Sequence, residues 1–470
     1  MSNTRVIAFM VALIVFAAAS GVFAQATGTF TGRVADQNGG VLPGTTVTAT
    51  ARATGLVRVA ITNEEGLYNI TALNPGAYDI KVEIPGFGPS VRENVTLLTG
   101  TTLTLDFSLS VAAQAETITV TGAAPLLETT QATASSNLQN QEVQELPMLN
   151  RSLGALIQLT PGAREETARI GVPGTASTHA YFNVGGNGRG TLVLVDGTDN
   201  HDDIDAGATI AYTLEGIQEF KVMPHGVSAE YGKSGGGVVT LVTKSGTNVL
   251  HGSGFLYGRS DKLTSIDYFA DPKNGGSGKP PYRRVQYGAS IGGPVIQDRV
   301  WYHGSLELID QKYTLPLARR ITDLQSYLVP LNIDVLPATA YRQPFEDLLG
   351  NGKVNFQLSQ DHTGFVRYAI ERTTLYNTGL RFGSALRATH PEWDDNHFNA
   401  WNVGIGETWV VSPTKLNSFN FQYLHYKQNQ FVPQCADMGF TPEQCLLQTL
   451  VFPSVSTSPA PMTSGFPSRD

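Results

Sequence analysis

The chain has 470 residues, of which 15% are charged and 49 are glycine, and its formal net charge is −8. This length suits about three domains, and a glycine-rich chain with few charges favours strands and turns over long surface helices. The acidic balance and the lack of any lysine or arginine run exclude a nucleic-acid partner.

Residues 1–24 have the pattern of a cleavable export signal. Arg5 supplies a positive start, residues 6–19 are apolar, and small residues at 22–24 suit cleavage before Gln25. The alternative, a membrane anchor, needs about 20 apolar residues, which is longer than this stretch. We therefore predict an exported chain.

Residues 27–111 read as short strands separated by turns. Val47, Ala49 and Ala51 alternate with threonines, and Pro43-Gly44 is one of several turns. This spacing predicts an antiparallel β-sandwich. The segment resembles the carboxypeptidase regulatory-like domain, a small transthyretin-like sandwich, through Gly32, Val34, Asp36, Gly40, Pro43, Gly44, Gly66, Tyr68, Leu73, Pro75, Gly76, Tyr78, Gly86 and Phe87.

That resemblance does not imply a peptidase here. A zinc peptidase needs closely spaced histidine and glutamate ligands, and no histidine is followed three residues later by glutamate. We expect neither an enzyme nor a cofactor. Tyr68, Tyr78 and Phe87 are predicted to lie in the sandwich core, and the alternative is a carbohydrate-binding platform on the sandwich surface.

A linker is predicted at residues 112–135, which are small, polar and poorly periodic. Residues 116–121 within it are prone to form a strand. Such a segment can add to the exposed edge of a partner's sheet through its main chain. The alternatives are a last strand of the sandwich and plain linker.

Residues 136–247 contain three ordered strand motifs. They lie at residues 188–197, 217–222 and 231–246, and an apolar helical face of Leu153, Leu156, Ile157 and Leu159 precedes them. The three motifs in this order resemble the α/β plug domain of TonB-dependent outer-membrane receptors. The resemblance implies TonB in the periplasm as a partner, and it implies a TonB box at Glu116, Thr117, Ile118, Thr119, Val120 and Thr121.

Two further residue sets are weaker candidates for sites. Export makes a disulfide between Cys435 and Cys445 plausible, the alternative being two free thiols. Hard cations prefer several carboxylate oxygens, so one acidic loop is a weak calcium candidate against a solvated loop. Its residues are Asp196, Asp199, Asp202, Asp203 and Asp205.

From residue 248 to 470 the chain alternates apolar and polar residues in about seven strands. Their connections alternate between long and short, and one long connection is expected to run to about Gly350. This alternation is typical of an outer-membrane β-barrel and less so of the alternative, an array of soluble sandwiches. Val354, Phe356 and Leu358 are expected to face lipid, whereas Asn355, Gln357 and Ser359 face the lumen.

Seven strands cannot enclose a domain of the plug's size, and an open sheet leaves main-chain groups unpaired in lipid. We therefore expect an N-terminal fragment of a larger receptor in the outer membrane of a Gram-negative-type bacterium. The expected function is energised uptake of an oligosaccharide, peptide or siderophore. The alternative is a cell-surface adhesion protein that binds carbohydrate through the sandwich.

Overall fold

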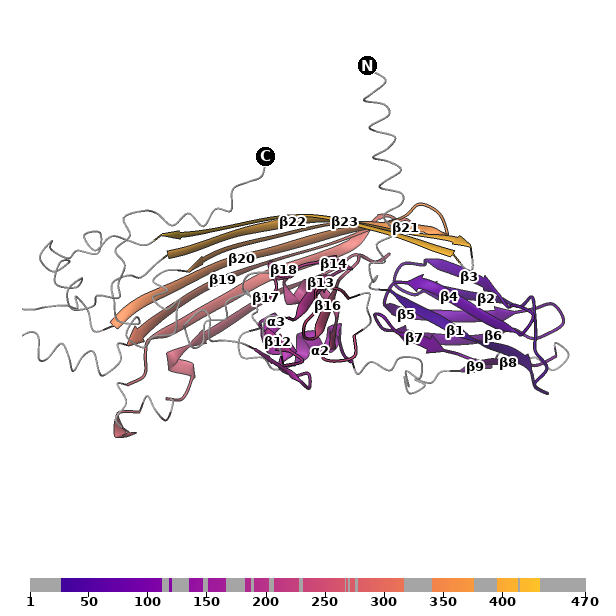
Figure 1. Cartoon of the computed structure of the whole chain (residues 1–470), viewed down its shortest axis with the longest axis horizontal. Helices are drawn as coiled ribbons and strands as arrows, with labels where there is room; N and C mark the ends of the chain where they lie inside the picture. Colours follow the sequence, from indigo (N-terminus) through magenta and orange to yellow (C-terminus); the bar gives the residue numbers. More distant parts are fainter. Residues whose placement is uncertain are drawn as a thin grey trace, which may run out of the picture.

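The structure is a computed structural model that describes most of the chain between residues 27 and 431. The described residues are 27–111, 118–120, 135–146, 151–165, 182–186, 190–202, 207–227, 231–266, 268, 271–274, 278–316, 340–375, 395–412 and 415–431. They form a β-sandwich, a mixed middle domain and a seven-stranded sheet, in chain order (Figure 1). The prediction of a mainly β chain is confirmed. No helix among these residues is long and apolar enough to cross a membrane.

The sandwich has two sheets. One has the order β4-β1-β7, with β8 also paired to β1, and the other has the order β3-β2-β5-β6-β9. Alternate residues such as Val47 on β2 and Ile80 on β5 are fully buried between the sheets, as the alternation predicts. The strands are β1 Gly28–Asp36, β2 Thr46–Ala51, β3 Val57–Ile61, β4 Leu67–Leu73, β5 Gly76–Glu83, β6 Ser90–Leu97, β7 Thr102–Thr104, β8 Phe107–Leu109 and β9 Ile118–Val120.

Two tyrosines lie in this core rather than on its surface. Tyr68 and Tyr78 are each 2% exposed, and burial raises the pKa of both phenols. The Tyr68 hydroxyl donates to the Leu105 carbonyl at 2.8 Å, so the phenol is satisfied without water. The predicted core position is confirmed, and neither ring is available to stack on a sugar. Phe87 packs half-buried against the same core.

The middle domain is built around a mixed sheet of order β10-β15-β16-β13-β14. Only β13 and β16 run parallel in this sheet, and β11 pairs with β12 separately. Phe220 and Leu241, which face each other across β15 and β16, are both fully buried. The elements are β10 Ser136–Gln139, α2 Asn140–Glu145, α3 Leu153–Ile157, β11 Ala163–Glu165, β12 Phe182–Val184, β13 Leu192–Val195, β14 Thr198–Asp199, the 3-10 turn η3 Leu214–Gly216, β15 Ile217–Met223 and β16 Val238–Thr243.

Helix α3 is confirmed but is shorter than expected. Ser152 caps its start by accepting from the Ala155 amide at 3.2 Å, and Leu156 and Ile157 are fully buried. Leu159 was expected on the same apolar face but is 51% exposed. The reason is that the helix ends at Ile157, so the helical spacing no longer applies two residues later.

The seven-stranded sheet is antiparallel, and each strand pairs with the next along the chain. Residues 297–299 join β18 to β19 and residues 358–361 join β20 to β21. These short turns lie at the end of the sheet near the sandwich (Figure 1), which confirms the predicted alternation of connections. The strands are β17 His251–Ser260, β18 Tyr282–Ile296, β19 Val300–Pro316, β20 Ala340–Gln357, β21 His362–Leu375, β22 Asp395–Ser412 and β23 Lys415–Phe431. Two 3-10 turns, η4 Asp261–Leu263 and η5 Pro272–Asn274, lie between β17 and β18.

One expected connection is wrong. The pattern predicted a long loop to about residue 350, but β20 begins at Ala340 and pairs with β19 along its whole length. Its inward positions mix Phe345 and Leu349 with the buried carboxylate of Asp347. Because one face carries both apolar and charged side chains, the hydrophobic alternation that marks a strand is hidden.

The two faces of the sheet follow the predicted alternation. Within β20, Val354 is 40% exposed, whereas Lys353 is buried against the middle domain. Leu358 and Ser359 were expected on opposite faces, but both are exposed because they lie in the turn after β20. Among the described residues the first and last strands, β17 and β23, are not paired to each other. Large apolar side chains on the exposed face include Leu306, Val354, Val366, Tyr368, Phe421 and Tyr423.

Candidate functional site

A tight hairpin of the middle domain carries the buried carboxylate of Asp196. The hairpin joins β13 to β14 through Asp196 and Gly197, which have φ of 47° and 79°. Two successive positive φ values suit a type I′ turn, for which Asp-Gly is a favoured sequence. The Asp196 carboxylate accepts from the Thr243 amide at 3.0 Å and from its hydroxyl at 2.6 Å. The turn is therefore tied to the end of β16.

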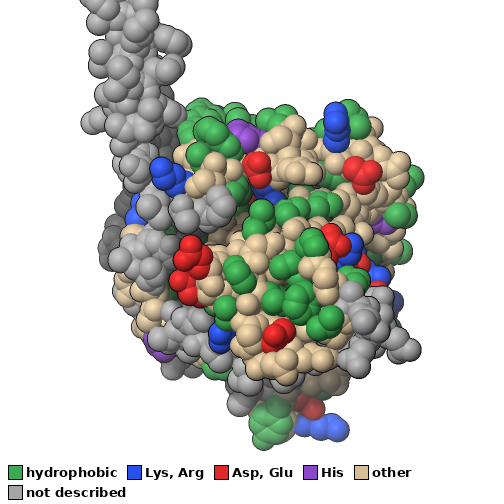
Figure 2. All heavy atoms as spheres, turned by 90° about the vertical axis from the view of Figure 1, so that its right-hand side faces the viewer, with side chains coloured by type: hydrophobic (Ala, Val, Ile, Leu, Met, Phe, Trp, Pro, Cys, Tyr) green, Lys and Arg blue, Asp and Glu red, His purple; other side chains and the backbone are tan. Residues whose placement is uncertain are grey.

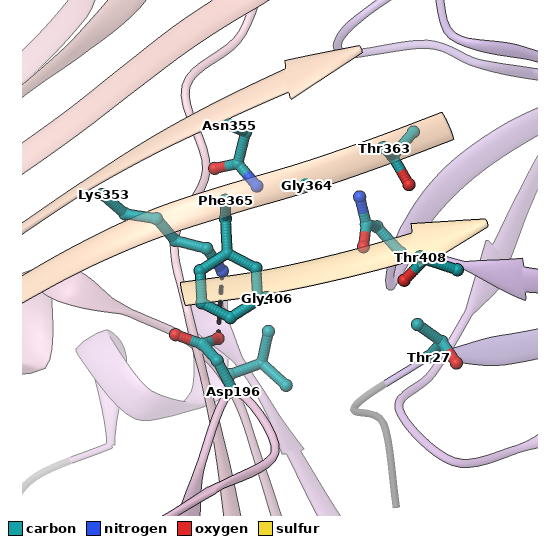
Figure 3. A pocket seen from close by; sticks show the side chains of 11 residues that line it. Thr27, Asp196, Lys353, Asn355, Thr363, Gly364, Phe365, Gly406 and Thr408 are labelled. Atoms are coloured by element: carbon teal, nitrogen blue, oxygen red, sulfur yellow. Dashed lines mark hydrogen bonds and ion pairs between the residues drawn. The ribbon is translucent and has the colours of Figure 1, made fainter. Parts of the chain in front are cut away.

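Two cations of the seven-stranded sheet converge on this carboxylate. Lys353 Nζ on β20 lies 3.0 Å from Asp196 Oδ1, and Arg367 Nη1 on β21 lies 2.9 Å from Oδ2. All three side chains are at most 6% exposed. Figure 3 shows Lys353 reaching across to Asp196 from its strand. We refer to these three residues as the buried charge cluster.

The register of the sheet explains why the cluster needs an anion. Lys353 and Arg367 are directly opposite each other on β20 and β21, and like charges in that position repel. Asp196 bridges the pair. Burial raises the pKa of the Asp196 carboxyl, but Lys353, Arg367 and the Thr243 hydrogen bonds outweigh it, so the pKa is lowered overall. The carboxylate is therefore charged at neutral pH.

Arg367 also holds the rest of the hairpin. Its guanidinium donates to the Val195 carbonyl at 2.7 Å and to the Thr198 hydroxyl at 2.8 Å. It also donates to Gln422 on β23 at 3.0 Å. The planar fork of arginine suits several acceptors at fixed angles. One side chain therefore joins the hairpin to two strands of the sheet, β21 and β23.

A second set of contacts fixes the segment before β15. The Thr213 hydroxyl lies 2.5 Å from the Ser305 hydroxyl on β19 and donates to Asn351 on β20 at 3.0 Å. The Ala211 amide donates to Glu371 on β21 at 2.7 Å. These groups are buried, so each lost partner leaves a costly unsatisfied atom. The middle domain is thus attached to the inner face of β19–β21.

The third contact joins the start of α3 to β17. Arg151 pairs with Glu215 at 2.5 Å, and both side chains are nearly buried. Its guanidinium also lies over the Tyr257 ring at 4.4 Å, which is a cation–π contact. Because Tyr257 is on the first strand of the sheet, this arginine extends the attachment to β17.

The sandwich is docked on both other bodies. The Thr99 amide and hydroxyl donate to Glu219 on β15 at 2.9 and 2.8 Å, and Lys221 donates to the Gly100 carbonyl at 3.1 Å. Burial raises the pKa of Glu219, although Thr99 and Lys221 act in the opposite direction. Arg58 on β3 is buried and donates to the Gln360 carbonyl in the turn between β20 and β21.

Asn248 connects the sandwich to the first tight turn of the sheet. Its side-chain nitrogen donates to the Thr54 carbonyl at 2.8 Å and to Asp298 at 2.6 Å. Its side-chain oxygen accepts from the Trp301 indole at 2.8 Å. One amide therefore fixes segments that are almost 200 residues apart.

A small cavity borders the buried charge cluster between the three bodies (Figure 3). Its volume is about 50 Å³, and Thr27 of the sandwich, Asp196, Lys353 and Phe365 are among its lining residues. Ligand pockets usually measure about 300–1,000 Å³. This cavity has room for water or an ion rather than for a siderophore, peptide or sugar chain.

The end of the molecule that carries the sandwich has no single-sign charged surface. Acidic and basic side chains are scattered among neutral ones on the described part of this face (Figure 2). A nucleic-acid-binding face would gather lysine and arginine together.

The structure separates the acidic residues predicted for one loop. Asp196 belongs to the buried charge cluster, and Asp199 pairs with Lys233 at 2.9 Å. Asp202 is described, whereas Asp203 and Asp205 lie outside the described residues. No group of three potential metal ligands occurs within the part of the chain that is described. The calcium loop stays a prediction.

Two other candidates have different outcomes. Ile118, Thr119 and Val120 of the proposed TonB box form β9, the last strand of the sandwich, which was an alternative to a free segment. Cys435 and Cys445 lie outside the described residues.

Sequence reasoning missed Lys353 and Arg367. The sequence did carry a signal for them, because each is a charged residue at a lumen-facing position of an alternating strand. A buried charge at such a position needs an oppositely charged partner within the lumen.

Family models match two of these bodies, the sandwich and the start of the seven-stranded sheet. A family model for the carboxypeptidase regulatory-like domain matches residues 29–110, and a model for an outer membrane beta barrel domain matches residues 242–345. The TonB-dependent transporter Oar of Myxococcus xanthus is 26% identical over 356 residues, which are 71% of this chain. The chain is therefore similar to a TonB-dependent transporter over most of its length.

The chain spans about a third of the Oar protein, 32% of its length. Two solved structures are also similar to it. The outer membrane transporter YddB from Escherichia coli is 11% identical over 64% of this chain and 40% of that chain, with a TM-score of 0.49. The siderophore receptor PirA from Pseudomonas aeruginosa is 17% identical over 64% and 42% of the two chains, with a TM-score of 0.41.

Proposed function

We propose that this chain is the N-terminal part of a TonB-dependent outer-membrane receptor that takes up a ligand by energised transport. The observation that carries the proposal is the buried charge cluster, which fastens the middle domain to the inner face of the strands through Asp196. A domain held inside a barrel by a few buried polar contacts can block passage and can still be released. Buried ion pairs depend strongly on geometry, so the contacts of the cluster are lost together when one partner moves.

Each body then has a role in the proposal. Residues 136–247 are the plug, residues 248–470 are the first part of a barrel in outer-membrane lipid, and residues 27–111 are an accessory sandwich. Residues 112–135 form a linker in which the segment 116–121 binds TonB in the periplasm. Within the described part of the chain β17 and β23 are not paired to each other. This supports a barrel completed by further strands, because main-chain groups left unpaired in lipid are costly.

The proposed activity makes and breaks no covalent bond. The ligand class is an oligosaccharide, a peptide or a siderophore, bound from outside the cell. The cavity beside the buried charge cluster is too small for any of these, which supports a ligand site elsewhere on the receptor. The cluster itself is proposed to hold the plug and not the ligand.

Uptake in cells tests the proposal. Cells that carry the intact gene are given fluorescently labelled oligosaccharides, peptides or siderophores, with and without a protonophore that collapses the inner-membrane gradient. We expect one label to enter, and we expect its entry to stop with the protonophore or on deletion of residues 116–121. Deletion of residues 122–127 is the matched control and should leave uptake intact. Uptake that is indifferent to both the protonophore and the first deletion would refute the proposal.

A further inference from the structure

The segment proposed to bind TonB is already part of a sheet. Strand β9 lies parallel to β6, with Ser90 opposite Ile118, Val91 opposite Thr119 and Arg92 opposite Val120. It is the last strand in the order β3-β2-β5-β6-β9. The sandwich therefore satisfies main-chain groups of the same residues that strand addition to TonB would use.

We infer that the sandwich captures the TonB-box-like segment and that TonB gains it only when β9 leaves β6. This inference rests on the proposed function, because it concerns the regulation of the same segment. Neighbouring residues of a strand direct their main-chain groups to opposite sides. A strand of three residues thus offers one or two residues to each neighbour, so its outer edge alone is a short platform for a partner strand.

The capturing strand is itself held in place. β6 is paired along β5 within the sandwich, and the sandwich is fixed to the middle domain by the bonds between Thr99 and Glu219. Arg58 fixes it to a tight turn of the sheet. A pull on residues 118–120 therefore acts first on the pairing of β9 with β6 and reaches the middle domain only after that pairing has opened.

The strength of this capture suits a reversible device. Three paired residues form about two or three main-chain hydrogen bonds, each of ordinary net strength. Together they correspond to a reduction of about ten- to a hundredfold in the affinity of TonB for the segment. Such a factor tunes the interaction without abolishing it.

A disulfide across the two strands tests the inference. Val91→Cys and Thr119→Cys are introduced together, in a chain that also carries Cys435→Ser and Cys445→Ser. Paired residues on neighbouring strands have a Cα separation that a disulfide accepts. The purified chain in detergent is oxidised with oxidised glutathione, and its affinity for the C-terminal domain of TonB is measured by biolayer interferometry before and after reduction. We expect the oxidised chain to bind at least about tenfold more weakly than the reduced chain.

The matched control places the same bond at the opposite edge of the sheet. Thr48→Cys with Val59→Cys joins β2 to β3, whose residues are also directly opposite. This chain should bind TonB equally well in both redox states. A loss there would indicate that any disulfide in the sandwich disturbs binding, and it would overturn the inference drawn from β9.

A synthetic peptide of residues 112–125 separates the two proposals. If the peptide binds TonB and the locked chain binds as well as the reduced one, capture is wrong while the TonB-binding role stands. In that case TonB adds to the outer edge of β9. If neither the peptide nor the reduced chain binds TonB, the TonB-binding role falls and the inference falls with it. If the peptide binds TonB and only the disulfide-locked β9 chain loses TonB affinity, the result supports both the TonB-binding role and the capture by the sandwich.

Discussion

Replacement of Asp196 by asparagine is the most informative perturbation of the buried charge cluster. The change keeps the size of the side chain and removes its charge. Lys353 and Arg367 then remain directly opposite each other, both buried and without their anion. Asparagine can still accept one hydrogen bond from Thr243, so the loss is mainly electrostatic.

The expected cost follows from the burial of the three groups. Removing one partner of a buried ion pair costs about 3–5 kcal/mol, because the charge left behind is desolvated and unpaired. At about 1.4 kcal/mol for each factor of ten, the equilibrium for local opening rises by about two to four orders of magnitude. Lys353→Met should cost less than about 1 kcal/mol, because Asp196 and Arg367 remain as a neutral pair and the like-charge contact disappears.

Hydrogen exchange followed by mass spectrometry measures this opening in the native protein. The informative peptides cover residues 192–200 and 238–243, which contain the hairpin and the strand that Asp196 joins. Asp199→Asn is the matched control, since Asp199 is 40% exposed in its pair with Lys233 and such pairs contribute at most about 1 kcal/mol. The reasoning is refuted if Asp196→Asn leaves protection unchanged, or if Lys353→Met lowers protection more than Asp196→Asn does.

Three further predictions concern the contacts of Asp196, Glu219 and Asn248. The pKa of Asp196 is lowered in the folded chain, so its contribution is present above the ordinary aspartate pKa and is lost as pH falls through the folded value. Protection of residues 192–200 should therefore be constant from neutral pH down to about pH 4 and fall only below it. The pKa of Glu219 is raised in the folded chain, so docking of the sandwich should become more stable as pH falls through that raised value. The stabilisation should be complete below about pH 4.5, the ordinary glutamate range. Limited proteolysis of the linker measures the docking. Glu219→Gln should stabilise docking at neutral pH as protonation does, whereas Glu219→Ala should make the linker easier to cleave. Equal cleavage of the two variants would contradict this role of Glu219. Asn248→Ala removes the hydrogen-bonding partner of Thr54, Asp298 and Trp301 and should lower the thermal midpoint for release of the sandwich. Thr247→Ala is the control and should change the midpoint little, because the Thr247 hydroxyl bonds to its neighbours Val249 and His251 and not to the sandwich.

The strand pattern could be predicted wherever one face is uniformly apolar. Val47 and Ala49 alternate with threonines and are buried, and Val354 lies on the exposed face of its strand, so the alternation gave the buried and exposed sides at these positions. The start of β20 was missed because Phe345 shares its inward face with the buried Asp347. Periodicity detects a strand by its uniformly apolar face. A strand whose inner face contacts polar groups of another domain lacks such a face, so the pattern does not reveal it.

The buried charge cluster was out of reach for a different reason. Asp196 was noticed, but among neighbouring aspartates that suggested a cation from solution. Its partners are 157 and 171 residues away, and only the register between β20 and β21 brings Lys353 and Arg367 together. Sequence spacing carries no information on contacts at that separation. The Asp196-Gly197 pair was a local signal for a tight turn, because such a turn depends on two adjacent residues, but residues 188–197 were interpreted as a strand motif.

The docking of the sandwich has a consequence for the order of folding. Thr54 and Asn248 are separated by 194 residues, and Arg58 and Gln360 by 302, whereas most pairings inside the sandwich are far more local. Local contacts form early, and contacts of high sequence separation form late. The sandwich should therefore fold alone after export and then wait for the turns at residues 297–299 and 358–361. Docking of the sandwich is therefore a late folding step, which occurs only in chains whose first hairpins have formed in the correct register.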